Sequence, residues 1–468
     1  MYTPTIGLEV HAELKTRSKM FCGCPNSPHG SQPNQNICPV CMAHPGTLPV
    51  ANMEAVKKVI IFGTAVGGQI ATYSEFDRKN YFYPDIPKAY QISQYAFPFV
   101  VGGSLAGVAL TRVHLEEDTA RSQHDKGDKS LIDFNRAGVP LMELVTEPVI
   151  HDAKTAGDFA RELQLTLRSL GISDANMEKG EMRVEANISV SKTGELGTKV
   201  EVKNLNSFKS VEGAITYEIE RQIATLEKGE TLIQETRGWD EVKSKTVSQR
   251  SKESAKDYRY FPDPDLPPLD VSNYSELLVS RLDDIFNELP EKKRSKYKDI
   301  GLTNNVIETI LNDKTLDVYF SNICKQTAVS APILALSANY LVNDLLPLIT
   351  TIDDSDVVIS PVHFVMLMTM IHEKKLATRA AKDVLIAIAL DDTDPGVYAT
   401  EHNLLLTTNA ADVAALVAQV VAGNEAVVAE YQSGKVAAFQ FLLGQAMKLS
   451  RGAMDPKVIT EALKKAIE

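Results

Sequence analysis

Four of the five cysteines lie within twenty residues, as the pairs Cys22, Cys24 and Cys38, Cys41. Paired cysteines of this kind can place four thiolates tetrahedrally around Zn²⁺. Disulfides are rare in cytosolic proteins, so zinc explains the cysteines better than a disulfide framework if the chain is cytosolic. No general base accompanies them, and the predicted zinc site is therefore structural. Ordinary reduced thiols are the alternative.

Acidic side chains form a second group, spread over separate strand-like segments. Its members are Glu9, His11, Glu116, Glu117, Glu185 and Glu201. Glu9 and His11 are two residues apart and therefore share one face of a strand, whereas Glu117 must point away from Glu116. Acids that point inward need a cation, and Mg²⁺ takes oxygen ligands of this kind. The pattern alone leaves open whether the acids instead lie on a solvated outer face.

Residues 76–95 combine charges, amides and four tyrosines without an apolar period. This pattern is not that of a packed helix or strand. Lys79 and Lys88 could contact anions, and Tyr81 and Tyr83 could stack on a ring. The segment is thus suited to a charged, aromatic ligand such as a nucleotide, and a tyrosine-rich surface loop is the alternative.

Basic and amide side chains recur around residues 199–209 and 242–260. Lys203 precedes Asn204, Asn206 and Ser207, and Arg259 belongs to the second stretch. Cations beside amides and hydroxyls are suited to bind phosphate, although solvated charge is the usual alternative. The sequence contains neither a phosphate-binding loop nor a Gly-x-Gly-x-x-Gly turn after a strand, so any ATP site lacks a familiar motif.

The elements that position these side chains change in kind near residue 290. Before that point, short alternating runs predict strands at 5–11, 109–116, 183–190 and 199–203. Helical periodicity predicts helices at 51–66, 153–170 and 208–227. From residue 288 onward Leu, Ala, Ile and Lys recur at helical spacing. The predicted fold class is α+β, with a strand-rich domain followed by an all-α region.

Length and charge limit the organisation further. A chain of 468 residues is too long for one ordinary domain and predicts two or three. Its net charge of −12 argues against non-specific coating of nucleic acid but is compatible with a local basic patch. Residues 431–468, with six Lys or Arg against three acids, are a candidate for such a patch, and a solvated helical face is the alternative.

No apolar run approaches the roughly 20 residues that span a bilayer. The N-terminus enters a strand-like pattern at once, without the basic and apolar regions of a signal peptide. We therefore expect a cytoplasmic protein without a membrane partner.

Several long motifs, in order along the chain, resemble the B subunits of bacterial aspartyl/glutamyl-tRNA amidotransferases. They include Gly-Leu-Glu-Val-His at 7–11, the run at 76–95, Glu-Glu-Asp at 116–118, the segment 133–148, Val-Lys-Asn-Leu-Asn-Ser-Phe at 202–208 and the segment 257–265. The resemblance covers essentially the whole chain. It implies a catalytic cradle-like domain over 1–290, a helical domain over 291–405 and a small YqeY-like helical tail over 406–468 that binds tRNA.

The resemblance also implies a reaction. Such subunits use ATP and Mg²⁺ to phosphorylate the side-chain carboxylate of Glu or Asp mischarged on tRNA(Gln) or tRNA(Asn), and ammonia then gives the amide. An amidase (A) subunit releases the ammonia from glutamine, and a small C subunit completes the heterotrimer. The sequence contains no Gly-Gly-Ser-Ser-Gly-type amidase run, so we do not expect it to hydrolyse glutamine itself.

Site roles carried over from the family fall on matching positions. The Mg²⁺ positions are Glu9, His11, Glu117, Glu185 and Glu201, with Glu116 beside them. The expected ATP contacts are Lys79, Tyr81, Tyr83 and Lys88, and the further phosphate or substrate contacts are Lys203, Asn204, Asn206, Ser207 and Arg259. Many members carry Asp where this chain has Glu185, and only part of the family has the four cysteines. The competing hypothesis keeps the fold but makes the chain a non-catalytic tRNA-binding scaffold.

Overall fold

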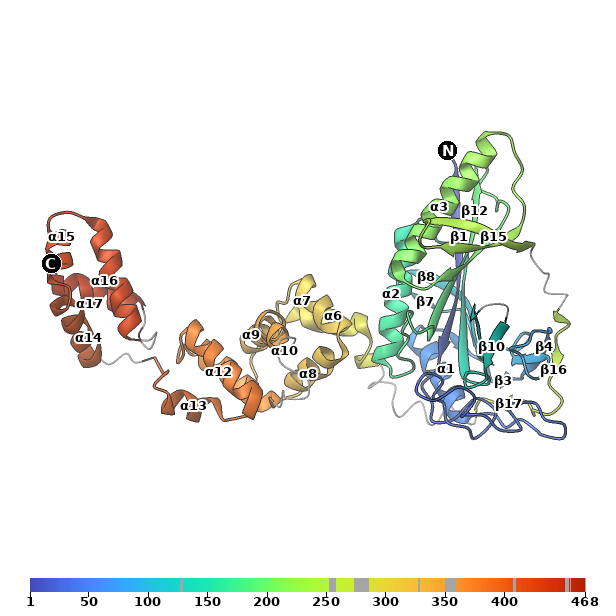
Figure 1. Ribbon diagram of the computed structural model, residues 1–468, viewed down its shortest axis with the longest axis horizontal. Coiled ribbons are helices and arrows are strands. Elements are labelled where there is room, and N and C mark those ends of the chain that lie inside the picture. Colours follow the sequence, from blue (N-terminus) through green and yellow to red (C-terminus); the bar gives the residue numbers. More distant parts are fainter. Residues whose placement is uncertain are drawn as a thin grey trace. The chain divides into compact units, whose positions relative to one another are not determined.

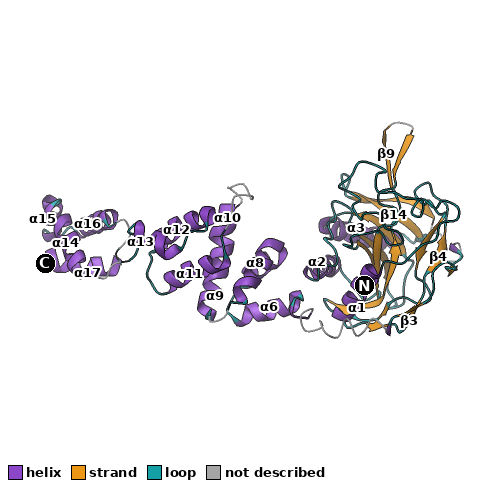
Figure 2. Ribbon diagram, turned by 90° about the horizontal axis from the view of Figure 1, so that it is seen from below, coloured by secondary structure: helices purple, strands orange, loops and turns teal. Residues whose placement is uncertain are grey.

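The computed structural model describes residues 1–126, 129–251, 258–272, 286–326, 329–349, 359–406, 410–450, 454 and 456–467. The chain divides into two compact units, Met1–Lys293 and Arg294–Glu468 (Figure 1). Strands dominate the first unit, whereas the described elements of the second are helices (Figure 2). The predicted fold class is confirmed. The division into three domains stays a prediction.

A ten-stranded sheet forms the centre of the first unit. The strand order along its path is β15-β14-β13-β12-β1-β11-β8-β6-β2, and β7 pairs with β8 off this path. The strands are β1 (Thr3–Glu13), β2 (Gln69–Ile70), β6 (Val100–Val101), β7 (Ser104–Leu105), β8 (Val108–Glu117), β11 (Pro140–Thr146), β12 (Met182–Ser191), β13 (Val200–Leu205), β14 (Glu235–Asp240) and β15 (Lys245–Ser251). The pair β13–β14 is parallel, and the other pairs are antiparallel. The four predicted strands coincide with β1, β8, β12 and β13.

Three helices pack on one face of this sheet: α1 (Met53–Ala65), α2 (Ala153–Ser169) and α3 (Phe208–Glu227) (Figure 1). Each begins after a capping side chain that accepts a backbone N–H bond, from Asn52, Asp152 and Ser207 respectively. All three predicted helices are therefore confirmed. Apolar residues of alternate strand positions, such as Val10 and Leu144, are buried beneath them. Because side chains alternate along a strand, the intervening residues face the other way.

Three small sheets complete the first unit. Their strands are β3 (Tyr73–Ser74), β4 (Asp77–Asn80), β5 (Tyr90–Ser93), β9 (Arg121–Lys126), β10 (Lys129–Asp133), β16 (Phe261–Pro262) and β17 (Leu269–Asp270). β4 lies between β16 and β5, β17 pairs with β3, and β10 pairs with β9. Residues 76–95 were expected to form neither helix nor strand, and this expectation is wrong for β4 and β5. Main-chain pairing holds these strands, so their side chains do not need an apolar period.

From Pro290 onward the described elements are helices. They are α6 (Pro290–Asp299), α7 (Asn304–Asn312), α8 (Lys314–Cys324), α9 (Ala331–Tyr340), the π-helical η2 (Leu341–Leu345), α10 (Leu346–Ile349), α11 (Pro361–His372), α12 (Thr378–Asp391), α13 (Pro395–Glu401), α14 (Ala410–Ala422), α15 (Glu425–Gln432), α16 (Val436–Leu449) and α17 (Pro456–Ile467). Side chains from α14, α16 and α17, among them Val417, Leu442 and Leu463, form a separate apolar core. The last four helices therefore share a core of their own.

One continuous helical stretch, Ala331–Ile349, has the length and composition of a membrane-crossing segment among the described residues. The bent pair α14–α15 meets the same test only if it is counted as one span. The expectation that no apolar run approaches this length is therefore not upheld at 331–349. This stretch also contains Asn343 and Asp344, and 22% of it is buried, including Ala338, Leu341 and Leu345.

Candidate functional site

Polar side chains gather on the sheet face opposite the three helices. We call this group the acidic face, and its members are Glu9, His11, Arg112, His114, Glu116, Glu143, Glu185, Glu201 and Lys203. The register of β1 sets Glu9 opposite Glu185 on one side and His11 opposite Glu143 on the other. In turn, Glu143 lies opposite His114 of β8. Strand alternation and register thus bring residues from distant segments onto one surface.

Glu143 lies between two histidines. Its Oε2 is 3.3 Å from His11 Nε2 and 3.3 Å from His114 Nε2. The carboxylate of Glu116 is the next neighbour of both rings, at 3.6 and 3.9 Å. His114 and Glu116 are both buried, and the Nδ1 of His114 has no hydrogen-bond partner among the described residues. The centre of the acidic face is therefore a compact array of carboxylates and imidazoles.

Three overlapping sets on the acidic face offer ligand atoms within 4.8 Å of one another. The sets are Glu9, Glu185, Glu201; Glu9, His11, Glu143; and His114, Glu116, Glu143. The first set offers only carboxylate oxygens, which hard cations prefer. Glu185 belongs to it, so the longer side chain at this position still reaches the other two carboxylates.

The sequence singled out six members of this face but missed two of its central residues. Glu9, His11, Glu116, Glu185 and Glu201 come together here, and Lys203 lies beside Glu185. The missed residues are Glu143 and His114. His114 alternates with buried apolar neighbours in β8, and that alternation could have identified it, whereas Glu143 is a single acid among the apolar residues of β11.

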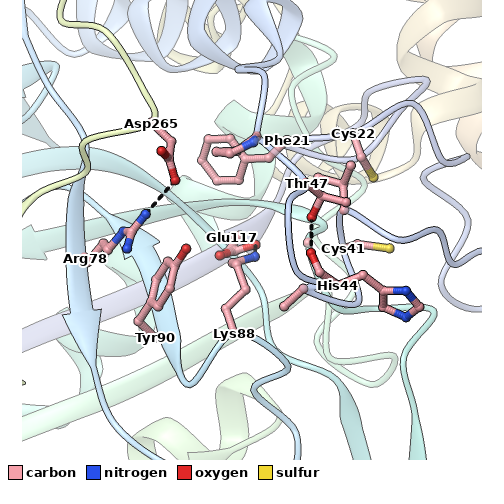
Figure 3. A pocket seen from close by; sticks show the side chains of 14 residues that line it. Phe21, Cys22, Cys41, His44, Thr47, Arg78, Lys88, Tyr90, Glu117 and Asp265 are labelled. Carbon is pink, nitrogen blue, oxygen red and sulfur yellow. Dashed lines mark hydrogen bonds and ion pairs between the residues drawn. The ribbon is translucent and has the colours of Figure 1, made fainter.

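Glu117 does not join the acidic face. It follows Glu116 at the end of β8, and its carboxylate accepts hydrogen bonds from Lys88 Nζ at 2.6 Å and from the backbone N–H of Ile92 at 3.0 Å. Lys88 and Glu117 line a different pocket of about 280 Å³, together with Cys22 and Cys41 (Figure 3). Two residues predicted to serve one site, Glu116 and Glu117, therefore point into different surroundings.

Burial and neighbouring charges shift the pKa values of the acidic face in both directions. Burial and the neighbouring Glu143 carboxylate raise the pKa of Glu9 to about 7. Burial alone would lower the pKa of His11, but its hydrogen bond and attraction to Glu143 outweigh burial and raise that pKa to about 9. Conversely, burial opposes ionisation of Glu143, yet His114 and His11 hold its pKa well below the usual range.

A cavity of about 350 Å³ opens beside the acidic face. Glu9, Glu143 and Glu201 line it, and so do the amines of Lys79 and Lys203. Burial disfavours a charged Lys79, but attraction to Glu116 is among the causes that raise its pKa. Lys203 Nζ lies 2.7 Å from Glu185 Oε2. The cavity therefore combines cations with carboxylates at short range.

Five tyrosines form a continuous row of ring contacts at the edge of this cavity. Successive ring centroids are 6.2 Å apart for Tyr83–Tyr81, 5.8 Å for Tyr81–Tyr258, 6.1 Å for Tyr258–Tyr260 and 4.5 Å for Tyr260–Tyr95. The last pair is stacked, and Tyr95 is 55% exposed. Three of the five line the cavity: Tyr95, Tyr258 and Tyr260. Tyr81 and Tyr83, which the sequence singles out as ring contacts, belong to the same row.

Four other predicted contacts do not belong to the described lining of this cavity. The Ser207 hydroxyl caps α3 by accepting the Ser210 N–H at 3.0 Å. Asn204 and Arg259 both adopt positive φ, at 65° and 45°, and their side chains are exposed, as is that of Asn206. The backbone carbonyl of Arg259 accepts a bond from Asn80 Nδ2 at 2.9 Å.

All four predicted zinc ligands come together. The Sγ atoms of Cys22, Cys24, Cys38 and Cys41 all lie within 4.8 Å of one another. A hydrogen bond from Cys22 is the main cause that lowers the pKa of Cys41 to about 4, whereas burial raises that of Cys24 to about 11. Four clustered sulfurs are a ligand set that suits Zn²⁺.

Comparison with known proteins agrees with the architecture. Residues 4–275 match the family described as the GatB/GatE catalytic domain, and residues 318–467 match the family described as the GatB domain. The chain is 41% identical over 483 residues to the B subunit of the aspartyl/glutamyl-tRNA(Asn/Gln) amidotransferase of Thermomicrobium roseum. It is 40% identical over 485 residues to the protein of the same name from Caldicellulosiruptor saccharolyticus. Both alignments cover 100% of this chain and 99% of the relative. Identity at this level over the full length, together with the catalytic-domain match over more than half of the chain, shows that the chain belongs to the B subunits of the aspartyl/glutamyl-tRNA(Asn/Gln) amidotransferases.

Proposed function

We propose that this chain phosphorylates the side-chain carboxylate of Glu or Asp mischarged on tRNA(Gln) or tRNA(Asn), using ATP and Mg²⁺, and then forms the amide with ammonia. The observation that carries the proposal is one cavity in which Glu9 and Glu201 lie beside the amines of Lys79 and Lys203. Phosphoryl transfer between two anions needs such cations and positioning more than it needs covalent help from the protein.

Mg²⁺ fits the ligands available on the acidic face. Glu9, Glu185 and Glu201 would hold it, because they offer three carboxylates in one group. Glu185 Oε2 is buried and lacks a well-oriented hydrogen bond, although Lys203 Nζ lies 2.7 Å away. When bound, Mg²⁺ supplies positive charge to the phosphate oxygens.

The side chains around the cavity have separate roles in the proposed reaction. Lys79 and Lys203 bind phosphate oxygens, and the tyrosine row offers ring faces for a nucleotide base. No general base is required for the first step, since a carboxylate is already ionised at pH 7. Its oxygen bonds to the γ-phosphorus as the bond to the bridging oxygen breaks, and ADP leaves with that electron pair.

Amide formation completes the reaction. The nitrogen of ammonia attacks the carbonyl carbon of the acyl phosphate, inorganic phosphate leaves, and the nitrogen loses a proton to solvent. We propose that an amidase A subunit supplies the ammonia and that a small C subunit completes a heterotrimer. The relatives are named as B subunits, which supports an assembly of several chains. The lack of an amidase run in this sequence supports the division of labour.

The four cysteines are proposed to hold structural Zn²⁺. Their loop contributes little apolar core, and its backbone is instead fastened to residues 133–135. The N–H of Asn34 donates to Asp133 Oδ1 at 2.9 Å, and that of Asn36 donates to Asn135 Oδ1 at 2.8 Å. A metal would fix the part of the loop that these bonds leave unrestrained.

The first experiment measures phosphate release from γ-labelled ATP by the chain co-expressed with its amidase and small partner. Each reaction receives Glu-tRNA(Gln), Asp-tRNA(Asn) or neither, with ammonia as nitrogen donor. Release that depends on one mischarged tRNA and is lost without Mg²⁺ is the expected result. Tight tRNA binding without ATP cleavage would instead favour the non-catalytic scaffold.

Glu201→Gln tests the metal ligands directly. We expect it to lower the tRNA-dependent ATP cleavage by more than about 100-fold, beyond the effect usual for an outer-shell partner. Glu195→Gln is the matched control, because Glu195 is exposed in the loop between β12 and β13. Equal turnover by the two variants would refute the assignment of Glu201.

A further inference from the structure

Lys19 is a buried amine beside the cysteine cluster. Its side chain has 0% relative exposure, and its Nζ lies 3.9 Å from Cys41 Sγ. The same Nζ donates to the carbonyl oxygen of Phe134 at 3.2 Å. A buried positive charge is costly unless an anion lies close to it. Among the described residues no carboxylate forms an ion pair with Lys19.

The sulfur cluster is the nearest source of that negative charge. Four thiolates around one Zn²⁺ carry two net negative charges, which are also costly when buried. Cys41 Sγ already accepts the backbone N–H of Cys38 at 3.2 Å. An ammonium at the same sulfur would offset half of the excess charge and add a second N–H donor. Outer-shell donors of this kind orient metal ligands and tune their basicity.

The position of Lys19 also links the cluster to the rest of the domain. Phe134, whose carbonyl Lys19 contacts, donates its own N–H to Asn34 Oδ1 at 2.7 Å. The residue after Lys19 donates its N–H to the carbonyl of Gly138 at 2.7 Å. The lysine stem packs beside the same glycine, where an added Cβ would lie 3.6 Å from Lys19 Cδ. The Lys19 side chain is therefore packed between the cysteine sulfurs and residues 134–138.

We infer that Lys19 is a positioning residue of the metal centre: its ammonium donates to Cys41 Sγ, offsets one of the two excess negative charges and fastens the cluster to Phe134. The inference rests on the proposed zinc occupancy. Lys19 is fully buried, so its ammonium is not an ordinary solvated surface charge.

Metal retention gives a test that does not depend on catalysis. Wild-type chain and Lys19→Met, each purified with its partner subunits, are assayed for zinc content. Both are then mixed with the chromogenic chelator 4-(2-pyridylazo)resorcinol. We expect Lys19→Met to release zinc roughly 10- to 100-fold faster, the range for loss of an outer-shell partner. Lys293→Met is the control, because Lys293 is also buried but pairs with Glu288 at 2.8 Å.

The possible outcomes separate the two claims. Wild-type protein without bound zinc would overturn the zinc proposal, and the inference about Lys19 with it. Zinc bound by wild type and released equally slowly by Lys19→Met would overturn the inference alone.

A second variant covers the case in which Lys19→Met does not fold. Lys19→Gln keeps a hydrogen-bond donor without the charge, and faster zinc release than wild type is again expected. In Co²⁺-substituted protein, loss of the ammonium should move the sulfur-to-cobalt charge-transfer band to longer wavelength. If Lys19→Gln releases zinc at the wild-type rate and its cobalt charge-transfer band lies at the wild-type wavelength, the inference is contradicted.

Discussion

One carboxylate at the centre of the acidic face has two imidazole neighbours. Glu143 lies within 3.3 Å of both His11 and His114, and its charge is a main reason why the pKa of His11 rises to about 9 despite burial. Removal of one member of a buried charge network leaves the others without compensation. Glu143 therefore supports the charge balance of the acidic face through its two histidine neighbours.

Glu143→Gln is predicted to lower tRNA-dependent ATP cleavage by more than about 10-fold, because it removes the charge that both His11 and His114 contact beside the metal ligands. Phosphate release from labelled ATP measures the loss. Glu147→Gln is the matched control, since Glu147 follows the same strand but accepts a bond from Thr111 Oγ1 at 2.8 Å. Unchanged cleavage by Glu143→Gln would remove Glu143 from the site.

Tyr260→Leu is predicted to raise the KM for ATP and leave kcat largely unchanged. Stacking of a base on an aromatic side chain contributes about 1–3 kcal/mol, which corresponds to roughly 5- to 150-fold in affinity. Steady-state kinetics at saturating mischarged tRNA separate the two constants. Tyr73→Leu, outside the tyrosine row and in contact with Phe97, should behave as wild type. If kcat falls instead and KM does not change, Tyr260 does not bind the nucleotide base.

At the scale of residues, the sequence predicts those site residues that share one strand, because their spacing along the strand shows that they lie on the same face. Glu9 and His11 are an example, because two-residue spacing fixes a common face. Glu143 was missed because it is a single acid between apolar residues, and only the register with β1 and β8 shows its neighbours. The contact of Lys88 with Glu117 likewise depends on tertiary structure, since 29 residues separate the two.

At the scale of elements, short strands assemble the tyrosine side of the cavity. β16 pairs with β4, so Phe261 lies opposite Arg78 although the two are far apart in sequence. Arg78 also donates to Asp263 at 2.9 Å and to Asp265 at 2.8 Å. These contacts bring Tyr258 beside Tyr81, which local periodicity could not predict. Long helices and the main strands were predictable because their apolar periods are regular.

In the helical unit, Asp392 joins two helices. It ends α12 in the left-handed conformation, with φ 48°, and its Oδ1 accepts the Ser360 N–H at 2.7 Å at the start of α11. The same oxygen contacts His363 Nδ1 at 2.9 Å. Burial alone would raise the pKa of Asp392, but these hydrogen bonds outweigh it and lower the pKa.

Asp392→Asn should lower stability at neutral pH by no more than about 1 kcal/mol, because the side chain is partly exposed. A carboxyl with a depressed pKa stabilises the fold above its unfolded pKa, near 3.9, and this contribution is lost as pH falls through the folded value. The difference from wild type should therefore disappear in acid. Urea unfolding followed by circular dichroism measures it, with exposed Asp391→Asn as control. A constant difference at all pH values would contradict the role of the charge.

At the scale of the whole molecule, residues 413–467 carry their own apolar core. A segment with its own core can be removed without opening the core of the remaining chain. The basic excess of residues 431–468, six Lys or Arg against three acids, makes this segment a candidate phosphate-backbone contact.

Removal of residues 410–468 is predicted to weaken tRNA binding and leave ATP binding intact. Filter binding at two salt concentrations measures the first property, and competition with a fluorescent nucleotide analogue measures the second. Lys464→Gln with Lys465→Gln serves as a milder variant that keeps the helix. Each phosphate contact adds to the salt dependence of tRNA binding. In both variants the logarithm of the binding constant should therefore fall less steeply with the logarithm of salt concentration than in wild type. Unchanged tRNA affinity after truncation would identify the basic residues as a solvated face.

The end of β8 places two consecutive carboxylates in different surroundings: Glu116 beside the histidines and Glu117 beside Lys88. Side chains alternate with a period of two, so inserting or deleting one residue in this strand would exchange the two carboxylates. Each would then meet the wrong partners, even though the composition of the strand would hardly change. In genetic terms, β8 should accept many substitutions among apolar residues but no frame-preserving insertion or deletion of a single codon.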